Sequence, residues 1–220
     1  MTNISEKQVE AGQAIYTKQM LAIYDIAVLG ISNQFIWKCP TKRLEEHYNK
    51  YVSANHLDVG VGTGYFLDRC RFPSPAPRLA LMDLNLNTLE FASRRIARYN
   101  PETYRKNVLE PIFLEIEKFD SIGINYLLHC IPGSIESKAV VFDHLMALMN
   151  PDTVLFGSTI LRKGVKQNWF AKHLMEAYTQ KGIFSNNSDN LEGLTIALNK
   201  RFRDVSIDVV GCVALFSGRT

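Results

Sequence analysis

A glycine-rich turn after a short apolar run is the feature that most constrains this chain. The stretch His56–Gly64 reads HLDVGVGTG, and its glycines occupy alternate positions, Gly60, Gly62 and Gly64. The helix-compatible segment Tyr65–Phe72 follows directly. Glycine has no Cβ and readily adopts positive φ, so a ligand can lie against backbone N–H groups in such a turn. The pattern predicts a buried strand that turns over a ligand site into a helix.

Two well-known glycine-rich loops do not fit this stretch. A phosphate-binding P-loop requires Gly-Lys-Ser/Thr, which the sequence Thr63-Gly64-Tyr65 lacks. A dinucleotide-binding loop reads GxGxxG, whereas here the third glycine comes one residue early and Tyr65 stands in its place. In addition, the acid Asp58 precedes the first glycine by two residues. A carboxylate there would repel a pyrophosphate and favours a ligand that carries an ammonium group.

The stretch LDVGVGTG resembles the first motif of the class I S-adenosylmethionine (SAM)-dependent methyltransferases. The resemblance implies an α/β fold with a Rossmann-like seven-stranded, mostly parallel sheet, helices on both faces and an antiparallel C-terminal hairpin. It also implies SAM as cofactor and S-adenosylhomocysteine (SAH) as product. In this family the loop lies beneath the methionine part of the cofactor. We therefore expect Asp58, Gly60, Gly62 and Gly64 to bind it.

A second acid follows the next predicted strand. The apolar run Arg78–Met82 ends at Asp83, 19 residues after the last glycine of the loop. Ligands of open α/β sheets bind at the carboxyl ends of strands, and an acid at this spacing can accept both ribose hydroxyls of a nucleoside. The alternative is that Asp83 caps the helix predicted over Asn87–Tyr99, but the asparagines at 85 and 87 can do so unaided. We therefore expect Asp83, with its neighbour Leu84, in the cofactor site.

The third and fourth strands are predicted near Thr103–Val108 and over Phe119–Tyr126. The family often has an acid that binds the adenine amino group after the third strand, whereas this chain has Asn107 and Val108. The resemblance places Asn125 at the end of the fourth strand, beneath the sulfonium. Asn125 is followed by Tyr-Leu-Leu, so the Asn-Pro-Pro-Tyr type of tetrapeptide is absent. Its absence counts against methylation of nucleic-acid bases or glutamine amides.

His129 is the histidine that this reasoning places nearest the reacting centre. An imidazole is suited to remove a proton from an attacking hydroxyl near neutral pH. The alternative is a purely structural histidine in an apolar segment. Both remain open from the sequence.

The first 53 residues are predicted to form a helical lid. A helix is expected over Val9–Leu29 and another over Thr41–Tyr51, with an irregular aromatic stretch, residues 24–40, between them. The aromatic side chains either pack the lid onto the sheet or line a pocket for the methyl acceptor. Polar residues within so apolar a stretch favour the pocket, because buried polar groups need partners. The expected acceptor residues are Tyr24, Asn33, Trp37 and Tyr126.

The remaining chain continues the alternation of strands and helices and then changes. Parallel βα alternation places helices on both faces of one sheet, and two adjacent strands joined by a tight turn run antiparallel. The chain is thus expected to be one domain, with residues 1–53 as the lid and residues 54–220 as the SAM-binding core. The predicted elements are a helix over Ser137–Met149, a strand over Thr153–Ile160, helices over Asn168–Lys181 and Leu191–Phe202, and strands over Val205–Val210 and Val213–Ser217.

Composition narrows the classes of partner. The 220 residues are 46% hydrophobic and carry a net charge of only +3, which is enough for a large core and too little to imply nucleic acid. The densest basic run, Arg94-Arg95 with Arg98, lies at helical spacing and is interpreted as a solvated helix face. The four cysteines are far apart, so we expect no metal site. No apolar run is long enough for a membrane span and the N-terminus is polar, so we expect a cytoplasmic protein, either monomer or homodimer.

Three functions remain compatible with the sequence. The first is methyl transfer from SAM to the oxygen, nitrogen or carbon atom of a small molecule, for which alignment of the two reactants supplies most of the acceleration. The second is methylation of nucleic acid or protein, and the third is SAM binding without methyl transfer. The small size and the lack of a basic face favour the first.

Overall fold

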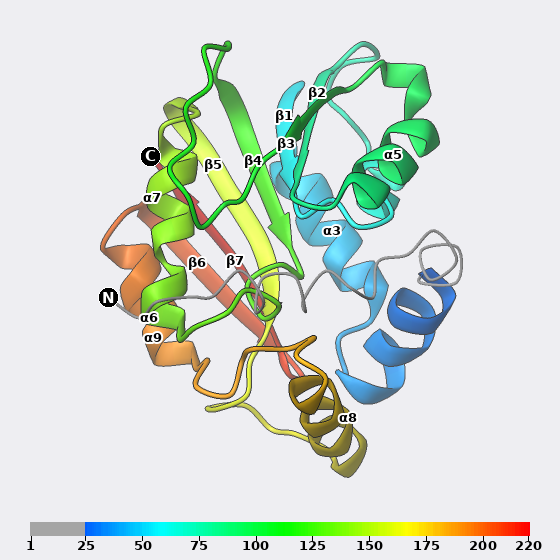
Figure 1. Ribbon diagram of the computed structural model, residues 1–220, viewed down its shortest axis with the longest axis vertical. Coiled ribbons are helices and arrows are strands. Elements are labelled where there is room, and N and C mark those ends of the chain that lie inside the picture. Colours follow the sequence, from blue (N-terminus) through cyan, green and yellow to red (C-terminus); the bar gives the residue numbers. More distant parts are fainter. Residues whose placement is uncertain (1–24) are drawn as a thin grey trace.

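The computed structural model describes residues 25–220, apart from the side chains at positions 26 and 27. One seven-stranded sheet runs through this part of the chain in the order β3-β2-β1-β4-β5-β7-β6 (Figure 1). The strands are β1 (Asn55–Val59), β2 (Arg78–Asp83), β3 (Glu102–Arg105), β4 (Phe119–Asn125), β5 (Met149–Ile160), β6 (Arg203–Val210) and β7 (Val213–Arg219).

The strand directions match the expected fold. Strands β1 to β5 pair in parallel, whereas β7 runs antiparallel to both β5 and β6. The terminal hairpin turns at Gly211, whose φ is +61° and where a Cβ would lie 2.1 Å from the carbonyl oxygen of Trp37. Only glycine fits a turn that approaches another backbone so closely. The predicted Rossmann-like sheet with an antiparallel hairpin is confirmed.

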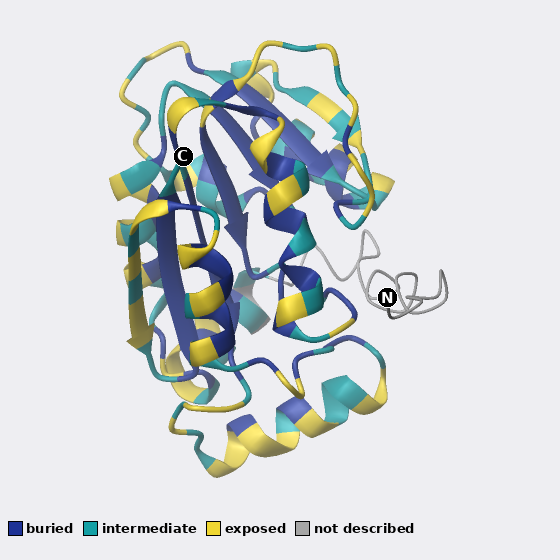
Figure 2. Cartoon of the chain, turned by 90° about the vertical axis from the view of Figure 1, so that its left-hand side faces the viewer, coloured by how far each residue is buried: buried dark blue, intermediate teal, exposed yellow. Residues whose placement is uncertain are grey.

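Helices cover both faces of the sheet, as parallel βα units require. In Figure 1, α6 (Ile135–Lys138), α7 (Val140–Met146) and α9 (Leu191–Asn199) lie on one side, and α3 (Thr41–Tyr51) and α5 (Leu86–Arg95) on the other. The short helix α4 (Tyr65–Arg69) follows the glycine-rich turn. Apolar side chains of the strands form a separate cluster on each face, so the central strands are dark in Figure 2, whereas the outer helix faces are exposed.

A third apolar cluster lies at the end of the sheet where the parallel strands have their carboxyl ends. It joins the N-terminal segment η1 (Asp25–Ile36) to α8 (Trp169–Gln180) and to the loop after β4. Trp37 and Phe184 meet there with ring centroids 5.9 Å apart. The cluster fixes two elements that are remote in sequence over the same edge of the sheet.

Several predicted elements differ in detail from the structure, and the helices expected over Tyr65–Phe72 and Leu191–Phe202 end early, at Arg69 and Asn199. The helix expected over Ser137–Met149 is interrupted at Ala139 and ends at Met146, because Met149 already pairs with Phe119 in the sheet. Phe119 of β4 pairs with Met149 of β5, and the next partners along the two strands are Ser121 and Val154. Between these two pairs β5 is three residues longer than β4, so β5 bulges there, and Asp152 with φ +65° lies in the bulge. The helix expected to extend to Tyr99 changes to a 3-10 turn, η2 (Ala97–Tyr99).

The N-terminal segment is more regular than expected. Residues 25–36, predicted as irregular beyond position 29, form a π-helix whose wide turns are seen in the bond from the N–H of Trp37 to the carbonyl of Ser32. Helix α3 begins at Thr41 and ends at Tyr51 as predicted. The earlier part of the helix expected over Val9–Leu29 lies outside the described residues.

The strand order locates the most favourable position for a ligand. The chain proceeds outward from β1 through β2 to β3 and then returns to β4 on the other side of β1. The crevice at the carboxyl ends of β1 and β4 is therefore a topological switch point, where open α/β sheets bind ligands. Within residues 25–220, no helix has the length and apolar content that crossing a lipid bilayer requires.

Candidate functional site

A cleft opens at this switch point and encloses about 1150 Å³, counted out to its mouth. Its floor is the glycine-rich turn after β1, and its sides are the chain ends that follow β2, β3 and β4. Residue Leu29 of η1 also contributes to the lining. Every residue predicted from the sequence to bind the cofactor lines this cleft: Asp58, Gly60, Gly62, Gly64, Asp83, Leu84, Asn107, Val108 and Asn125.

The three glycines of the floor share a left-handed backbone but have different surroundings. Their φ values are +71° at Gly60, +51° at Gly62 and +72° at Gly64. A Cβ on Gly60 would come within 2.8 Å of Leu127, and one on Gly64 within 3.1 Å of Ala92. A Cβ on Gly62 would meet no protein atom within 4 Å. Gly60 and Gly64 are thus needed for packing, whereas the space beside Gly62 belongs to the open cleft.

Asp58 is the penultimate residue of β1, and one oxygen of its carboxylate contacts buried polar side chains. Its Oδ2 accepts a hydrogen bond of 2.5 Å from the Tyr48 hydroxyl and lies 3.7 Å from Nε2 of His56. Burial raises the pKa of Tyr48 well above its usual value, so this phenol keeps its proton and acts as a donor. The Asp58 side chain remains 9% exposed, and the residue lines the cleft.

Asp83 ends β2 and is largely withdrawn from water. Desolvation raises the pKa of its carboxyl to about 6, although backbone N–H groups, that of Asn85 among them, partly oppose this shift. Helix α5 is capped by Asn85, whose side chain accepts from the N–H of Asn87. Asp83 is therefore not the helix cap, and the alternative explanation for an acid at this position does not hold. Asp83 lines the cleft.

The residues after β3 form the far end of the cleft. The Asn107 amide donates 2.8 Å to Oε1 of Glu110 and accepts from the N–H of Leu109, so the side chain closes a local turn. Apolar side chains, Leu84 and Val108, lie in the lining beside it. This part of the lining has an amide beside apolar side chains, in place of the acid that the resemblance implies.

Asn125, at the end of β4, presents a buried donor with no partner in the described chain. Its Oδ1 accepts from the Ser158 hydroxyl at 3.1 Å, whereas its Nδ2 is buried and makes no hydrogen bond to protein. An unsatisfied buried donor is costly and commonly marks a ligand position. Because Asn125 lines the cleft, its amide fits a ligand acceptor there.

The side of the cleft beyond β4 is formed by residues without formal charge. We call this surface the β4 wall; it consists of Leu29, Tyr126, Leu127, Cys130, Ile131 and Pro132. Tyr126 has φ +55°, a rare conformation for a residue with a side chain. Its hydroxyl donates 2.8 Å to Oδ1 of Asn33, and the Asn33 amide donates 2.9 Å to Thr41. Contacts with η1 and α3 thus hold the strained turn in place.

Of the acceptor residues predicted from the sequence, Tyr126 lines the cleft, whereas Asn33 and Trp37 are not among its lining residues. Asn33 is fully buried and fixes Tyr126, and Trp37 is 1% exposed within the apolar cluster at this end of the sheet. The expectation that Asn33 and Trp37 face the acceptor is corrected accordingly, because their polar and aromatic groups are already used within the protein. Tyr24 lies outside the described residues.

His129 does not reach the cleft. It is 3% exposed, its ring packs against Phe184 with centroids 4.6 Å apart, and its Nδ1 accepts from the N–H of Ile160 at 3.3 Å. Burial, with a smaller effect from the charge of Lys138, lowers its pKa to about 3. A buried histidine of low pKa that does not line the cleft is poorly suited to act as a base there, so the geometry favours the structural role over the catalytic one.

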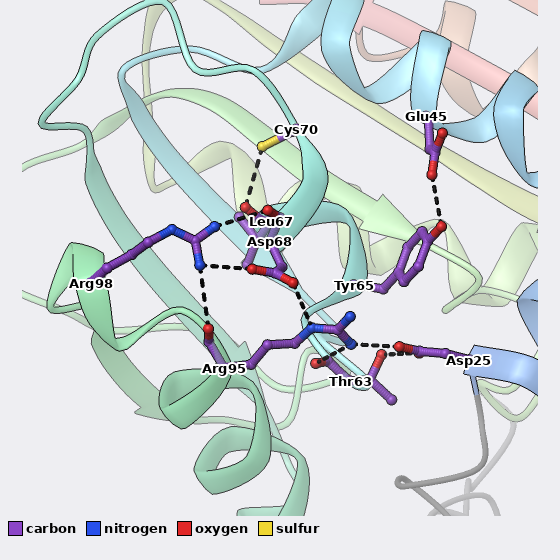
Figure 3. A network of polar contacts seen from close by, with 9 residues as sticks. All are labelled: Asp25, Glu45, Thr63, Tyr65, Leu67, Asp68, Cys70, Arg95 and Arg98. Atoms are coloured by element: carbon purple, nitrogen blue, oxygen red, sulfur yellow. Dashed lines mark hydrogen bonds and ion pairs between the residues drawn. The ribbon is translucent and has the colours of Figure 1, made fainter.

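The sequence did not predict a network of ion pairs and hydrogen bonds that joins the N-terminal segment to the glycine-rich turn and helix α4 (Figure 3). Arg95 donates 2.6 Å to Asp25 and 3.1 Å to Asp68, and the Thr63 hydroxyl of the glycine-rich turn donates 2.6 Å to Asp25. The interpretation of the basic run as a solvated face therefore fails at Arg95, whose side chain is 21% exposed, and holds at Arg94. The only sequence signal was that run, and it does not reveal its partners.

The cleft fits the expected SAM in its own chemistry. Gly62 leaves space that a Cβ would fill, and Asn125 presents an unsatisfied donor. Asp58 and Asp83 both line the cleft, and carboxylates are suited to accept hydrogen bonds from an ammonium group and a diol. Among residues 25–220, no three His, Cys, Asp or Glu side chains are grouped so that they can share a metal ion.

Comparison with known proteins agrees with this geometry. The profile of a family described as "Methyltransferase domain" matches residues 57–155. Demethylluteothin O-methyltransferase of Streptomyces thioluteus is 39% identical over 218 residues, which cover 99% of this chain and 95% of that protein. The physcion biosynthesis cluster O-methyltransferase of Aspergillus chevalieri is 40% identical over 209 residues, covering 94% of each. Among solved structures, the DhpI–SAH complex matches with a TM-score of 0.69 at 14% identity, covering 99% of this chain and 98% of that one.

Proposed function

Since the chain belongs to the class I SAM-dependent methyltransferases, we propose that it transfers the methyl group to an acidic hydroxyl, such as a phenol or an enol, of a small conjugated molecule. SAM is the cofactor and SAH the product, and the acceptor is a small molecule. The observation that carries the finer assignment is the division of the cleft into a charged half and an uncharged β4 wall.

The charged half binds the cofactor. The carboxylate of Asp58 accepts from the ammonium group, and the turn at Gly62 admits the amino-acid tail against its backbone N–H groups. Asp83 accepts from the ribose hydroxyls, and the slot beside Leu84 and Val108 holds the adenine, with Asn107 at its edge. Asn125 lies between this half and the β4 wall.

The β4 wall favours an acceptor that ionises without help. Bound SAM supplies a methyl group on a cationic sulfur, which is a good leaving group. None of the wall residues is a histidine or a carboxylate. The Tyr126 hydroxyl already donates to Asn33, and His129 lies behind the wall. Because the described residues of this wall include no general base, the protein's task is to align a nucleophile that has already lost its proton to water. Phenols and enols whose pKa is lowered toward neutrality by conjugation meet this condition, whereas aliphatic alcohols do not.

Two further observations support a small, neutral acceptor. The described wall is uncharged, so it offers no cation to a phosphate backbone and suits a neutral molecule. Both relatives named above are O-methyltransferases. We propose that the N-terminal segment up to residue 53 acts as a cap over the cleft, since Leu29 lines the cleft and the Asp25 carboxylate accepts a hydrogen bond from Thr63 of the glycine-rich turn. The cytoplasmic location and the monomeric or homodimeric state stay predictions.

The test is a series of substituted phenols and aliphatic alcohols of similar size, assayed with SAM at several pH values. We expect transfer to phenols only, and kcat/KM should rise with pH until each phenol is ionised, its midpoint following the phenol's own pKa. A pH midpoint that is the same for all acceptors would reveal an enzyme base and refute the proposal. Equal transfer to alcohols or amines would do so as well.

A further inference from the structure

A buried chain of hydrogen bonds leads from the end of α3 to the back of Asp58. Its members are Ser53, Ser121, His56 and Tyr48, and we call it the Tyr48–His56 chain. The backbone N–H of Ser53 donates 2.9 Å to the Ser121 hydroxyl, which lies 2.8 Å from Nδ1 of His56. Nε2 of His56 is 2.9 Å from the Tyr48 hydroxyl, which contacts Oδ2 of Asp58 at 2.5 Å.

The donors of this chain all point toward Asp58. As a carboxylate, Asp58 has no proton to give, so the single hydroxyl proton of Tyr48 must go to it. Nε2 of His56 must then donate to the Tyr48 oxygen, which leaves Nδ1 of His56 to accept from Ser121. Successive bonds polarise one another in the same direction in such a chain.

The Tyr48–His56 chain stabilises the buried carboxylate of Asp58 by hydrogen bonds, without a cation. No Lys or Arg within the described residues forms an ion pair with Asp58, and the nearest basic atom is Nε2 of His56 at 3.7 Å. The chain occupies Oδ2, while Oδ1 has no hydrogen-bond partner among residues 25–220 and the residue lines the cleft. A lysine in this position would neutralise Asp58. The neutral chain fixes the carboxylate and leaves its negative charge for a ligand.

We infer that Tyr48 and His56 are positioning residues for cofactor recognition, which hold Asp58 so that it binds the ammonium group in the amino-acid tail of SAM. The inference rests on the proposed function in one respect, namely that SAM binds in this cleft. It predicts an effect confined to one end of the ligand. Loss of the chain should weaken ligands that carry the tail and leave ligands that lack it unchanged.

The test compares SAH with 5′-methylthioadenosine, which has the same nucleoside and a thioether sulfur but no amino-acid tail. Tyr48→Phe keeps the ring that stacks on Phe66 at 5.5 Å and removes only the hydroxyl. We expect calorimetry to show SAH binding weakened about tenfold or more, the size of one charge-assisted hydrogen bond, and methylthioadenosine binding changed by less than about twofold. The matched control is Tyr51→Phe on the same helix, which should alter neither.

A second variant, Ser121→Ala, acts at the far end of the chain and should change the same ratio of affinities in the same direction by about threefold. It decides the matter if Tyr48→Phe does not fold. Nitrogen NMR of the wild-type protein should show His56 protonated at Nε2 and not at Nδ1.

Equal losses for both ligands, or a His56 protonated at Nδ1, would overturn the inference while leaving the proposed function intact. A wild-type protein that binds neither ligand would overturn both.

Discussion

Replacement of Gly62 by valine separates cofactor binding from folding more cleanly than any other single change. The residue has φ +51°, and a Cβ there would meet no protein atom within 4 Å. The substitution therefore causes no steric clash in the empty protein. Its cost is the left-handed backbone, about 1–2 kcal/mol for a residue with a side chain. For a chain of this length that lowers the melting temperature by roughly 2–8 °C.

The effect on the ligand should be much larger. The valine side chain would occupy open space of the cleft that Gly62 lines, where the proposed function puts the amino-acid tail of SAM. We expect calorimetry to show SAH affinity reduced by at least about 100-fold, which corresponds to about 2.7 kcal/mol. Thermal unfolding in the absence of ligand should still be cooperative.

The matched control is Gly62→Ala, which carries the backbone cost with a smaller side chain. We expect it to melt close to Gly62→Val and to retain more affinity for SAH. Unchanged SAH affinity in Gly62→Val would show that the ligand does not pass over this turn, and the assignment of the floor of the cleft would be wrong.

Three further predictions concern titration and buried charge. Burial holds the pKa of His129 at about 3, below its value in the unfolded chain. As pH falls from about 6 toward 3, the unfolded state therefore binds an extra proton, and the free energy of unfolding drops by about 1.4 kcal/mol per pH unit. Urea unfolding of His129→Gln should lack this loss, and equal pH profiles for the variant and the wild type would contradict the prediction. Because the pKa of Asp83 is raised to about 6, the affinity for SAH should fall as pH drops below that value, approaching tenfold per pH unit. In calorimetry, Asp83→Asn should bind SAH weakly at every pH. A wild-type affinity that does not depend on pH would exclude the ribose role. The side chains of Lys138 and Asp189 are fully buried, with Nζ 2.6 Å from Oδ2. In urea unfolding, Lys138→Met should lower the free energy of unfolding by about 3–5 kcal/mol, and the double variant with Asp189→Leu should recover most of this loss. A loss below about 1 kcal/mol in the single variant would show that the pair is not isolated from water.

The buried Lys138–Asp189 pair also anchors α6. The Lys138 ammonium donates to the carbonyl of Ser185 as well as to Asp189. It ties α6 to the loop before α9. A sequence pattern shows Lys138 only as a polar residue in an amphipathic helix, so its burial was not predictable.

Much of the fold was predictable because the signals are local. The alternation of apolar strands with helical segments, the glycine spacing and the turn at Gly211 each depend on residues close in sequence. The acids Asp58 and Asp83 were also identified correctly as cleft residues, since strand ends in a parallel sheet share one edge. Asn85 caps α5, as the capping preference of asparagine suggested.

What supports the site depended on the tertiary structure. The hydrogen bonds from Thr63 to Asp25, from Arg95 to Asp25 and from Tyr126 to Asn33 join residues 38, 70 and 93 positions apart. Whether a given asparagine lines a pocket or holds the residue that does is decided by which neighbour satisfies its amide. No periodicity encodes that choice. The sequence by itself determined the sheet, the glycine-rich turn and the two carboxylates, and only packing decided which side chains face the ligand.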